Sequence, residues 1–595
     1  MAAGQAKNTR LLVVTAELSR HYPGQIILEV EYRDRDLVRS LPGAKHIEMR
    51  RWRISLSWAS CLAIRGVFGD RLQVGPELEA WAWEEYSGRV QPALEALDRS
   101  LDPTADSEGD PRCRRYQRTG SEFLVVSGGA VCGDDRGVGK TVTMIAALER
   151  MGAYPCLIVA ERVGKRVWAR HFAEWAPNRS VTVVSSSGAK RRRELEAETD
   201  VVITNYESLR TASRLAHYGN MSLTIKEKTP GPLNRPWAAV VADEAHKAKD
   251  PHSKQTRALW QVGDDATGPC YALTGTPGGP EDLWALLRFV APEEFPSKTR
   301  FIDRYCTVTV GWHGGAEVTG LNPATEEEFR AAVNPRFMRR TKELVAPELP
   351  PKIGGINNPD GLVIRWVEMG AKQAKAYREM RDKQVAWLDG EPAAAFNGLS
   401  RLTRLQQFAN AYAELVEDGE DEEGRPKFRV QLAEPSSKCD DIEELLDDMK
   451  GEPLGIFAAS KQLINLLGAR LDKAKIPYGR ITGDENDRQR AQAEDDFQKG
   501  NLRALLLTYA GSTSITLTRA NTCCFMQRSF GAIPNLQAED RFHRIGQTAD
   551  HVLVIDCIAP GTVEETVVKP ALEGEVELFE EVVRDRDLMR RILNG

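Results

Sequence analysis

The stretch Gln537-Ala538-Glu539-Asp540-Arg541-Phe542-His543-Arg544-Ile545-Gly546-Gln547 carries two arginines three residues apart. Residues at that spacing lie on one face of a helix, so the two guanidinium groups are predicted to point the same way and to reach a phosphate. Alone, the stretch could equally be a charged surface helix. Its interpretation depends on three motifs upstream: Gly137-Val138-Gly139-Lys140-Thr141, Asp243-Glu244-Ala245-His246 and Leu273-Thr274-Gly275-Thr276-Pro277.

The glycine motif follows the apolar run Ala130-Val131-Cys132 and precedes a predicted helix over 140–151. Its glycines allow backbone N–H groups to turn toward phosphate oxygens, and the helix presents its positive end to them. Lys140 is predicted to supply charge to the β- and γ-phosphates of ATP, and Thr141 to supply a hydroxyl to Mg²⁺. The strict P-loop pattern requires glycine six residues before the lysine, where this chain has Asp134.

The acidic pair Asp243-Glu244 follows the apolar run Ala238–Ala242, which places it at the C-terminal end of a buried strand. Ligands gather at that edge of an open α/β sheet. We expect Asp243 to hold Mg²⁺ and Glu244 to orient and deprotonate the attacking water. His246 either couples this pair to the next motif or is an ordinary packing histidine.

In this order the motifs resemble the Swi/Snf-like branch of superfamily 2 helicases, which are DNA-stimulated ATPases and DNA translocases. The resemblance covers most of the chain, from about Arg112 onward. It implies ATP and Mg²⁺ as cofactors, double-stranded or branched DNA as partner, and a monomeric motor whose two lobes close on ATP. Asp134 to Thr141 is similar to the variant P-loop of that branch.

The resemblance also implies further site residues. Tyr116-Gln117 resembles the Q motif, in which the glutamine amide reads the adenine edge. The predicted nucleotide contacts are Gln117, Asp135, Gly137, Val138, Gly139, Lys140, Thr141 and Gln537. The predicted catalytic residues are Lys140, Glu244, Arg541 and Arg544, and the predicted Mg²⁺ ligands are Thr141 and Asp243. DNA contacts or coupling segments are expected at Leu157–Trp168, Ile203–Tyr206, Thr274–Pro277, Thr482–Gly483 and Thr508–Leu517, where Trp168 and Tyr206 are expected to be core residues.

Strands alternate with helices along most of the chain, which indicates α/β lobes with parallel sheets and crossover helices. We predict two RecA-like parallel-sheet lobes with helical insertions and a small N-terminal α/β accessory domain. The expected boundaries are 1–105 for the accessory domain, 106–296 for the first lobe, 297–435 for a helical connecting region, 436–560 for the second lobe and 561–595 for a C-terminal helical segment.

Within the accessory domain, the pattern predicts a strand around Leu28–Tyr32, a short helix over Asp34–Leu41 and a second strand over Trp52–Trp58. This order is similar to the small HARP-like domain that precedes the motor in annealing helicases. A generic α/β cap that only packs on the motor remains the alternative.

Composition sets outer limits on function. A chain of 595 residues is too long to fold around a single hydrophobic core, so several domains are expected. Its hydrophobic content of 42% fits a soluble protein. It lacks an apolar run long enough for a membrane span, and its ten cysteines include no C-x-x-C pair, so a cytoplasmic, nucleoid- or DNA-associated protein is expected. The net charge of −6 leaves DNA binding to local basic patches. Candidates are Arg50–Arg53, Arg112–Arg118 and Lys190–Arg193.

The chain departs from the family at three places. Gly511-Ser512-Thr513-Ser514 stands where Gly-Gly-x-Gly is usual, Phe530 replaces a tryptophan, and Gly278-Gly279-Pro280 replaces an asparagine-bearing turn. Serine tolerates positive φ poorly, so coupling between ATP and DNA could be altered. The leading hypothesis is translocation on duplex DNA, with fork remodelling or strand annealing as finer possibilities. The alternatives are a strand-separating DNA or RNA helicase and an ATP-gated nucleic-acid-binding scaffold with a weakened motor.

Overall fold

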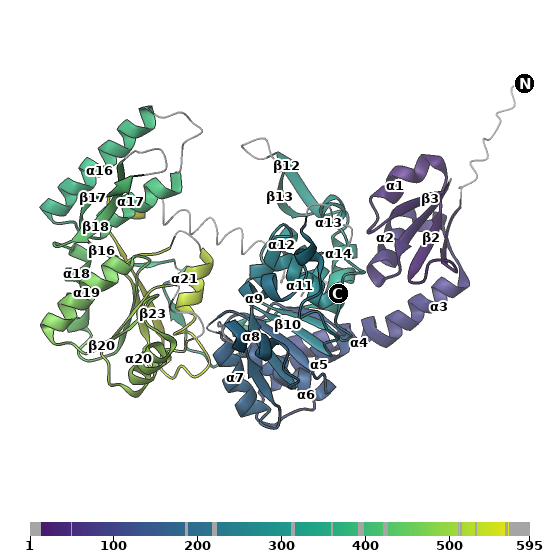
Figure 1. The fold of residues 1–595 in the computed structure, drawn as a ribbon, viewed down its shortest axis with the longest axis horizontal. Coiled ribbons are helices and arrows are strands. Elements are labelled where there is room, and N and C mark those ends of the chain that lie inside the picture. The colour runs from purple at the N-terminus through teal and green to yellow at the C-terminus, as the bar shows by residue number, and fades with distance from the viewer. Residues whose placement is uncertain are drawn as a thin grey trace, which may run out of the picture. The chain divides into compact units, whose positions relative to one another are not determined.

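The computed structural model describes residues 13–569 apart from 49, 163, 185–187, 217–222, 311–315, 357, 359–360, 391–397, 421–425, 510, 512–514, 530–531 and 566–568. The described chain forms two compact units, with the division between Val345 and Ala346 and the segment Arg136–Val138 grouped with the second (Figure 1). The first unit holds a small N-terminal sheet and a larger parallel sheet, and the second unit holds another parallel sheet.

The N-terminal sheet has five strands in the order β3-β4-β2-β1-β5, antiparallel except for β1 with β5. Its strands are β1 Val14–Leu18, β2 Gln25–Glu29, β3 Lys45–Glu48, β4 Arg51–Ser55 and β5 Leu72–Val74. The helices beside it are η1 Tyr32–Asp34, α1 Arg35–Arg39, α2 Trp58–Phe68 and η2 Gly69–Arg71. The predicted strand over Trp52–Trp58 therefore stops early. Ser57 caps α2 by accepting a hydrogen bond from Ser60 N over 3.2 Å, so Trp58 begins a helix.

A long helical segment leads from this sheet to the first lobe. It consists of α3 Pro76–Glu85, the π-helical η3 Tyr86–Val90 and α4 Gln91–Leu101. Ala96 and Leu97 of α4 belong to the same buried cluster as Phe123 and Leu124 of α5 (Arg115–Ser127). The helix α4, which lies inside the predicted 1–105 region, thus contributes to the core of the first lobe.

The first lobe is built on seven parallel strands in the order β14-β6-β11-β10-β7-β9-β8. They are β6 Ala130–Cys132, β7 Cys156–Ala160, β8 Val181–Val183, β9 Val201–Asn205, β10 Ala239–Asp243, β11 Cys270–Leu273 and β14 Phe337–Met338. The helices are α6 Lys140–Met151, α7 Gly164–Trp175, α8 Gly188–Leu195, α9 Tyr206–Ala212, α10 Ile225–Lys228, η4 Ala245–Ala248, α11 Lys254–Asp264 and α12 Pro280–Val290. The predicted parallel α/β fold is confirmed.

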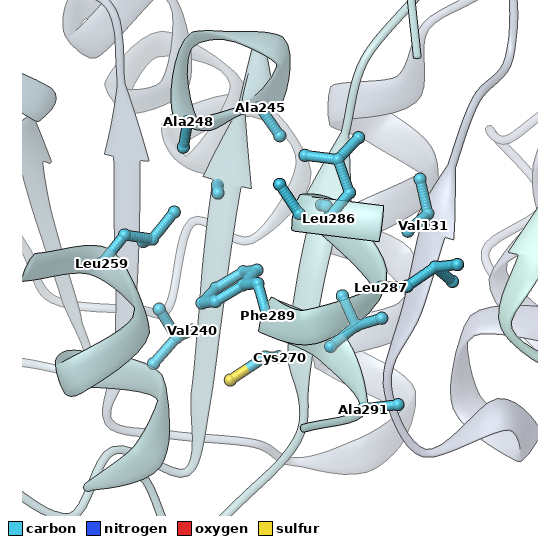
Figure 2. Packing of buried hydrophobic residues seen from close by; sticks show 14 of the residues in the cluster. Val131, Val240, Ala245, Ala248, Leu259, Cys270, Leu286, Leu287, Phe289 and Ala291 are labelled. Atoms are coloured by element: carbon cyan, nitrogen blue, oxygen red, sulfur yellow. The ribbon is translucent and has the colours of Figure 1, made fainter. Parts of the chain in front are cut away.

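The helix α12 shows how sequence sets this packing. Pro280 occupies the first helical turn, where its missing N–H costs nothing. Leu286, Leu287 and Phe289 then lie in one buried cluster with Val240 of the central strand β10 (Figure 2). Burying such apolar side chains contributes about 1.5–3 kcal/mol each.

Residues 297–345 return the chain to the first sheet. They form α13 Lys298–Tyr305, the hairpin β12 Cys306–Val310 with β13 Ala316–Leu321, α14 Glu326–Val333, η5 Asn334–Arg336, β14 and α15 Lys342–Val345. The indole N–H of Trp58 donates to the carbonyl of Ala331 over 3.3 Å, which fastens the N-terminal domain to α14. The predicted helical connecting region thus also supplies an edge strand and hairpins.

The second unit holds a parallel sheet in the order β15-β23-β22-β19-β21-β20, with β16 also paired to β23. Its strands are β15 Lys352–Ile353, β16 Val363–Trp366, β19 Leu454–Phe457, β20 Tyr478–Ile481, β21 Ala504–Leu507, β22 Thr522–Phe525 and β23 Val552–Ile558. A separate hairpin of β17 Tyr412–Glu420 and β18 Pro426–Ala433 shares a buried cluster with the parallel sheet. The helices are α16 Ala371–Gly390, α17 Gly398–Asn410, α18 Ser437–Asp448, α19 Lys461–Ala474, α20 Asp487–Lys499 and α21 Ala532–Glu539.

Several predictions lie outside the described residues. They concern Ser512–Ser514, Phe530 and most of the C-terminal segment 561–595. Among the described helices, none combines the length and the apolar character needed to cross a membrane.

Candidate ATP site

The predicted P-loop joins β6 to α6. Gly137 and Gly139 have φ angles of 81° and 85°, a left-handed conformation that favours glycine. The ammonium group of Lys140 donates to the carbonyls of Asp134 and Asp135 over 2.8 and 3.0 Å. The lysine is therefore held inside the loop that its own helix begins, and Thr141 follows it in the first turn of α6.

The two aspartates of the loop face the segment that follows β14. Asp134 is fully buried and pairs with the equally buried Arg340 over 2.5 Å. Asp135 accepts from Arg339 Nη2 over 3.3 Å and from the backbone N–H of Lys342 over 3.1 Å. Asp134, which stands in place of the P-loop glycine, is thus the buried partner of Arg340. The carboxylate of Asp135 accepts hydrogen bonds from within the protein.

The predicted metal-binding carboxylate ends the central strand β10. Asp243 Oδ2 accepts a hydrogen bond from the indole N–H of Trp168 over 2.7 Å, and the carbonyl of Asp243 accepts from Tyr206 over 2.7 Å. Burial, reinforced by the neighbouring Glu244, raises the pKa of Asp243 to about 7, while Trp168 and Lys140 oppose the rise. A divalent cation would remove this cost of burying a charge.

These residues fit a magnesium ion bound with nucleotide. Mg²⁺ is usually held by one or two carboxylates together with substrate phosphates. The described part of the chain contains no cluster of three or more metal-ligating side chains. Asp243 and the hydroxyl of Thr141 would supply the protein ligands of an ion that binds together with a nucleotide.

Glu244 and His246 link this pair to the next motif. Glu244 adopts a φ of 49°, which is uncommon for a residue with a side chain and turns the chain sharply after β10. Its carboxylate lies 3.4 Å from His246 Nδ1, and that nitrogen lies 3.2 Å from Thr274 Oγ1 and 3.3 Å from Thr276 Oγ1. Of the two interpretations of His246, the geometry favours coupling between the motifs.

Gln117 lies in the first turn of α5. Its side-chain amide oxygen Oε1 accepts a hydrogen bond from the backbone N–H of Arg114 over 2.9 Å. A Cβ atom added to Gly139 would lie 2.5 Å from Gln117 Nε2, so the amide NH₂ group faces the P-loop. The Oε1 atom of the predicted adenine-reading amide is thus used in the cap of α5, while its Nε2 atom lies on the side of the P-loop.

The prediction that Arg541 and Arg544 share a helix face is wrong. The helix α21 ends at Glu539, and both arginines lie in the turns that follow. The backbone continues through bonds to the third residue back, from Arg541 N to Ala538 O and from Phe542 N to Glu539 O. Arg544 Nη1 donates to Ile515 O and Thr516 Oγ1 over 3.3 and 3.2 Å.

Two residues beyond the end of the helix make specific contacts. Phe542 is fully buried against Gly455, where an added Cβ would lie 2.1 Å from the ring. His543 Nε2 lies 2.9 Å from the carbonyl of Pro350. These contacts hold the turns that follow the helix in place. We name Arg541–Arg544 the arginine turn; Gln537 lies one turn earlier, half-buried on α21.

Buried charges hold the base of the arginine turn. Glu539 is 1% exposed and pairs with Lys352 over 2.9 Å and with Arg528 over 2.6 Å. Arg528 also pairs with Asp556 over 2.5 Å and stacks on Phe525 with 3.7 Å to the ring centroid. Burial acts to raise the pKa of Glu539, but Lys352 and Arg528 outweigh it and the pKa is lowered.

Most threonine hydroxyl groups that the structure describes in the expected DNA-contact segments are buried. Thr204, Thr274, Thr276 and Thr482 are at most 1% exposed. Thr482 Oγ1 donates to Glu485 over 2.6 Å, which caps a turn after β20. Trp168 and Tyr206, expected to be core residues, are each 1% exposed. These buried side chains thus serve the fold.

Sequence reasoning missed three residues that support the site: Trp168 beside Asp243, Arg340 beside Asp134, and Glu539 beneath the arginine turn. Of these three, only Arg340 left a signal in the sequence, the adjacent pair Arg339-Arg340, since arginines that become buried need partners.

Comparison with known proteins adds the family. The SNF2-related domain matches residues 79–413, and the helicase conserved C-terminal domain matches residues 437–546. The chain belongs to the SNF2-related family. It holds that family's ATPase motor, and the predicted resemblance to the Swi/Snf-like branch is confirmed.

Relatives in the family are mostly larger proteins. Chromodomain-helicase-DNA-binding protein 7 of Gallus gallus is 27% identical over 504 residues, covering 77% of this chain and 16% of that protein. The ISWI chromatin-remodeling complex ATPase ISW2 of Saccharomyces cerevisiae is 26% identical over 488 residues, covering 78% of this chain and 40% of that protein. The chain therefore spans well under half the length of either relative. A solved structure, the Sulfolobus solfataricus SWI2/SNF2 ATPase core in complex with dsDNA, has 24% identity and a TM-score of 0.35, covering 78% of this chain and 94% of that one.

Proposed function

We propose that this chain hydrolyses ATP in order to translocate along double-stranded DNA. One observation carries the proposal: the residues that the sequence predicts for ATP binding and hydrolysis are divided between two separate parallel-sheet units. Lys140, Asp243 and Glu244 lie in the first unit, and Arg541 and Arg544 lie in the second. We propose that hydrolysis needs residues of both units, so that it depends on lobe closure as in a motor.

In the proposed mechanism Lys140 binds the β- and γ-phosphates, and Gln117 with the P-loop backbone positions the nucleotide. Mg²⁺, held by Asp243 and Thr141, would neutralise charge on the phosphates. Glu244 accepts a proton from the attacking water, and His246 connects Glu244 to Thr274 and Thr276. The arginine turn then offers its guanidinium groups to the charge that develops on the γ-phosphate.

Double-stranded DNA is the proposed substrate. Support comes from the family and from the relative chromodomain-helicase-DNA-binding protein 7, whose name describes a DNA-binding helicase. We place an accessory role on the N-terminal sheet up to about Gly75, because α4 already packs into the first lobe. Fork remodelling or strand annealing is the finer activity that we propose for the chain, with that domain tuning the choice of DNA.

The test is steady-state ATP hydrolysis with duplex, single-stranded and forked DNA and with single-stranded RNA. We expect strong stimulation by duplex or forked DNA. Displacement of a triplex-forming strand from duplex DNA, without separation of the duplex, would support translocation. Separation of the duplex strands would favour the helicase alternative, and stimulation by single-stranded RNA alone would overturn the DNA assignment.

A further inference from the structure

Arg340 follows β14 and is the only arginine among the described residues with a fully buried side chain, at 0% exposure. Its Nη2 donates to Asp134 Oδ2 over 2.5 Å, and its Nε lies 3.2 and 3.1 Å from the two carboxylate oxygens. Its Nη1 donates to the carbonyl of Tyr116 in α5. The planar guanidinium thus joins three segments, a role that the point charge of lysine does not reproduce.

The backbone around Arg340 runs beside the first half of the P-loop. Gly133 N donates to Met338 O over 2.7 Å, and Asp135 N donates to Arg340 O over 2.9 Å. The backbone N–H of Arg340 donates to Asp134 Oδ1 over 3.0 Å, and Arg339 Nη1 donates to Gly133 O over 3.1 Å. Each residue from Gly133 to Asp135 is therefore held by the segment after β14.

Those same residues orient the P-loop lysine. The ammonium of Lys140 donates to the carbonyls of Asp134 and Asp135, whose side chains Arg340 and Arg339 hold. A shift of Asp134 would move one of these carbonyls and change the direction of the lysine. A continuous set of contacts thus leads from Arg340 to the group that is proposed to bind phosphate.

Gly120, in the middle of α5, shows how little space surrounds this guanidinium. A Cβ atom added there would lie 2.5 Å from Arg340 Nη2 and 2.9 Å from Nη1. Glycine weakens a helix interior. The room that Arg340 needs accounts for glycine at this position.

We propose that Arg340 is a positioning residue for the nucleotide site. It reaches no nucleotide itself, and it acts by fixing Asp134 and Asp135, whose carbonyls direct Lys140. The inference rests on the proposed ATP site and adds to it a residue outside the motifs from which the site was predicted.

The decisive variant replaces both partners, Asp134→Leu with Arg340→Met. Removing one member of a buried ion pair leaves the other charge buried without a partner, whereas replacing both members by apolar residues often preserves stability. The matched control is Glu328→Leu with Arg304→Met, a buried bidentate pair between α13 and α14 in the same unit. Thermal unfolding and titration with a fluorescent ADP analogue, in the absence of DNA, are measured for both.

We expect both double variants to unfold near the wild-type temperature. The Asp134/Arg340 variant should bind the ADP analogue roughly 10- to 100-fold more weakly, as small displacements of a binding group do, and the control should bind normally. Arg340→Lys should give an intermediate loss, because charge is kept without the bidentate contact. Gly120→Ala should also weaken binding by displacing the guanidinium while every charge stays in place.

A folded Asp134/Arg340 double variant with wild-type affinity would overturn the proposal. If that variant does not fold, wild-type affinity in both Arg340→Lys and Gly120→Ala overturns it instead. The proposed function fails by a different result, the absence of DNA stimulation in the wild-type protein, which the DNA-free titration does not involve.

Discussion

The indole N–H of Trp168 donates to Asp243 Oδ2 over 2.7 Å, so a helix that follows β7 fixes the carboxylate at the end of β10. Trp168 is 1% exposed and packs on Phe172, which leaves the indole little freedom. The orientation of the predicted magnesium ligand is therefore set by a residue that does not itself meet the metal.

Trp168→Phe should keep the core and lose this hydrogen bond. Hydrogen bonds to charged groups contribute about 1.5–3 kcal/mol, so we expect a roughly tenfold higher Mg²⁺ requirement for ATP hydrolysis. The measurement is ATPase rate against Mg²⁺ concentration. Trp237→Phe is the control, because Trp237 is equally buried and donates to the carbonyl of Leu233, away from Asp243. Equal Mg²⁺ requirements in both variants would contradict the assigned role.

Glu244→Gln should bind ATP and DNA but scarcely turn over, because an amide does not accept the proton of the attacking water. The expected loss is on the order of 10²–10⁴ in rate.

Lys140→Ala should instead lose nucleotide affinity and turnover together, since the lysine contacts phosphate before and during the reaction. Nucleotide titration beside single-turnover hydrolysis separates the two. Loss of ATP binding in Glu244→Gln would make Glu244 a structural residue.

Arg544→Ala should bind ATP and DNA almost normally and lose DNA-stimulated turnover. Arginine fingers contribute about 10³–10⁵ in rate in other nucleotide hydrolases. Arg541→Ala should behave in the same direction or more mildly. The measurement is ATPase rate against DNA concentration. An Arg544→Ala protein still strongly stimulated by DNA would rule out a role for the second unit in hydrolysis.

A protein that begins at Gly75 should keep basal ATPase activity and lose its preference for branched over plain duplex DNA. The start point retains α4, whose Ala96 and Leu97 lie in the core of the first lobe. Arg50 and Arg51 of the deleted sheet pair with Glu31 and Glu48 and remain about half exposed. Unchanged DNA preference after the deletion would make this domain a structural cap.

The sequence predicted the elements whose signal is local. Continuous apolar runs such as Cys156–Ala160 gave buried parallel strands, and the glycines of the P-loop gave the turn before α6. Strand ends depended on other signals: Ser57 ends the predicted tryptophan strand by capping α2. The spacing of Arg541 and Arg544 predicted a helix. Spacing alone does not show that Phe542 is buried against Gly455, 87 positions earlier in the chain.

The supporting residues were hidden for the same reason. Asp134 departs from the strict P-loop pattern, and its partner Arg340 lies 206 positions away. Trp168 looked like a core residue, which it is, but its N–H group has a partner that only the sheet order brings near. Sequence patterns pointed to the predicted reacting groups, whereas the residues that contact and orient those groups come from distant segments of the chain.

The charges beneath the arginine turn have a consequence for how this chain tolerates mutation. Lys352, Arg528, Glu539 and Asp556 come from four segments and form one linked set of ion pairs, in which Arg528, Glu539 and Asp556 are buried and Lys352 is partly buried. Any single neutral substitution leaves an unmatched charge in the interior, so each is expected to be more harmful than its simple chemistry suggests. These four positions should accept change only as a coordinated set, and a library that varies them one at a time would report four intolerant sites where there is one shared requirement.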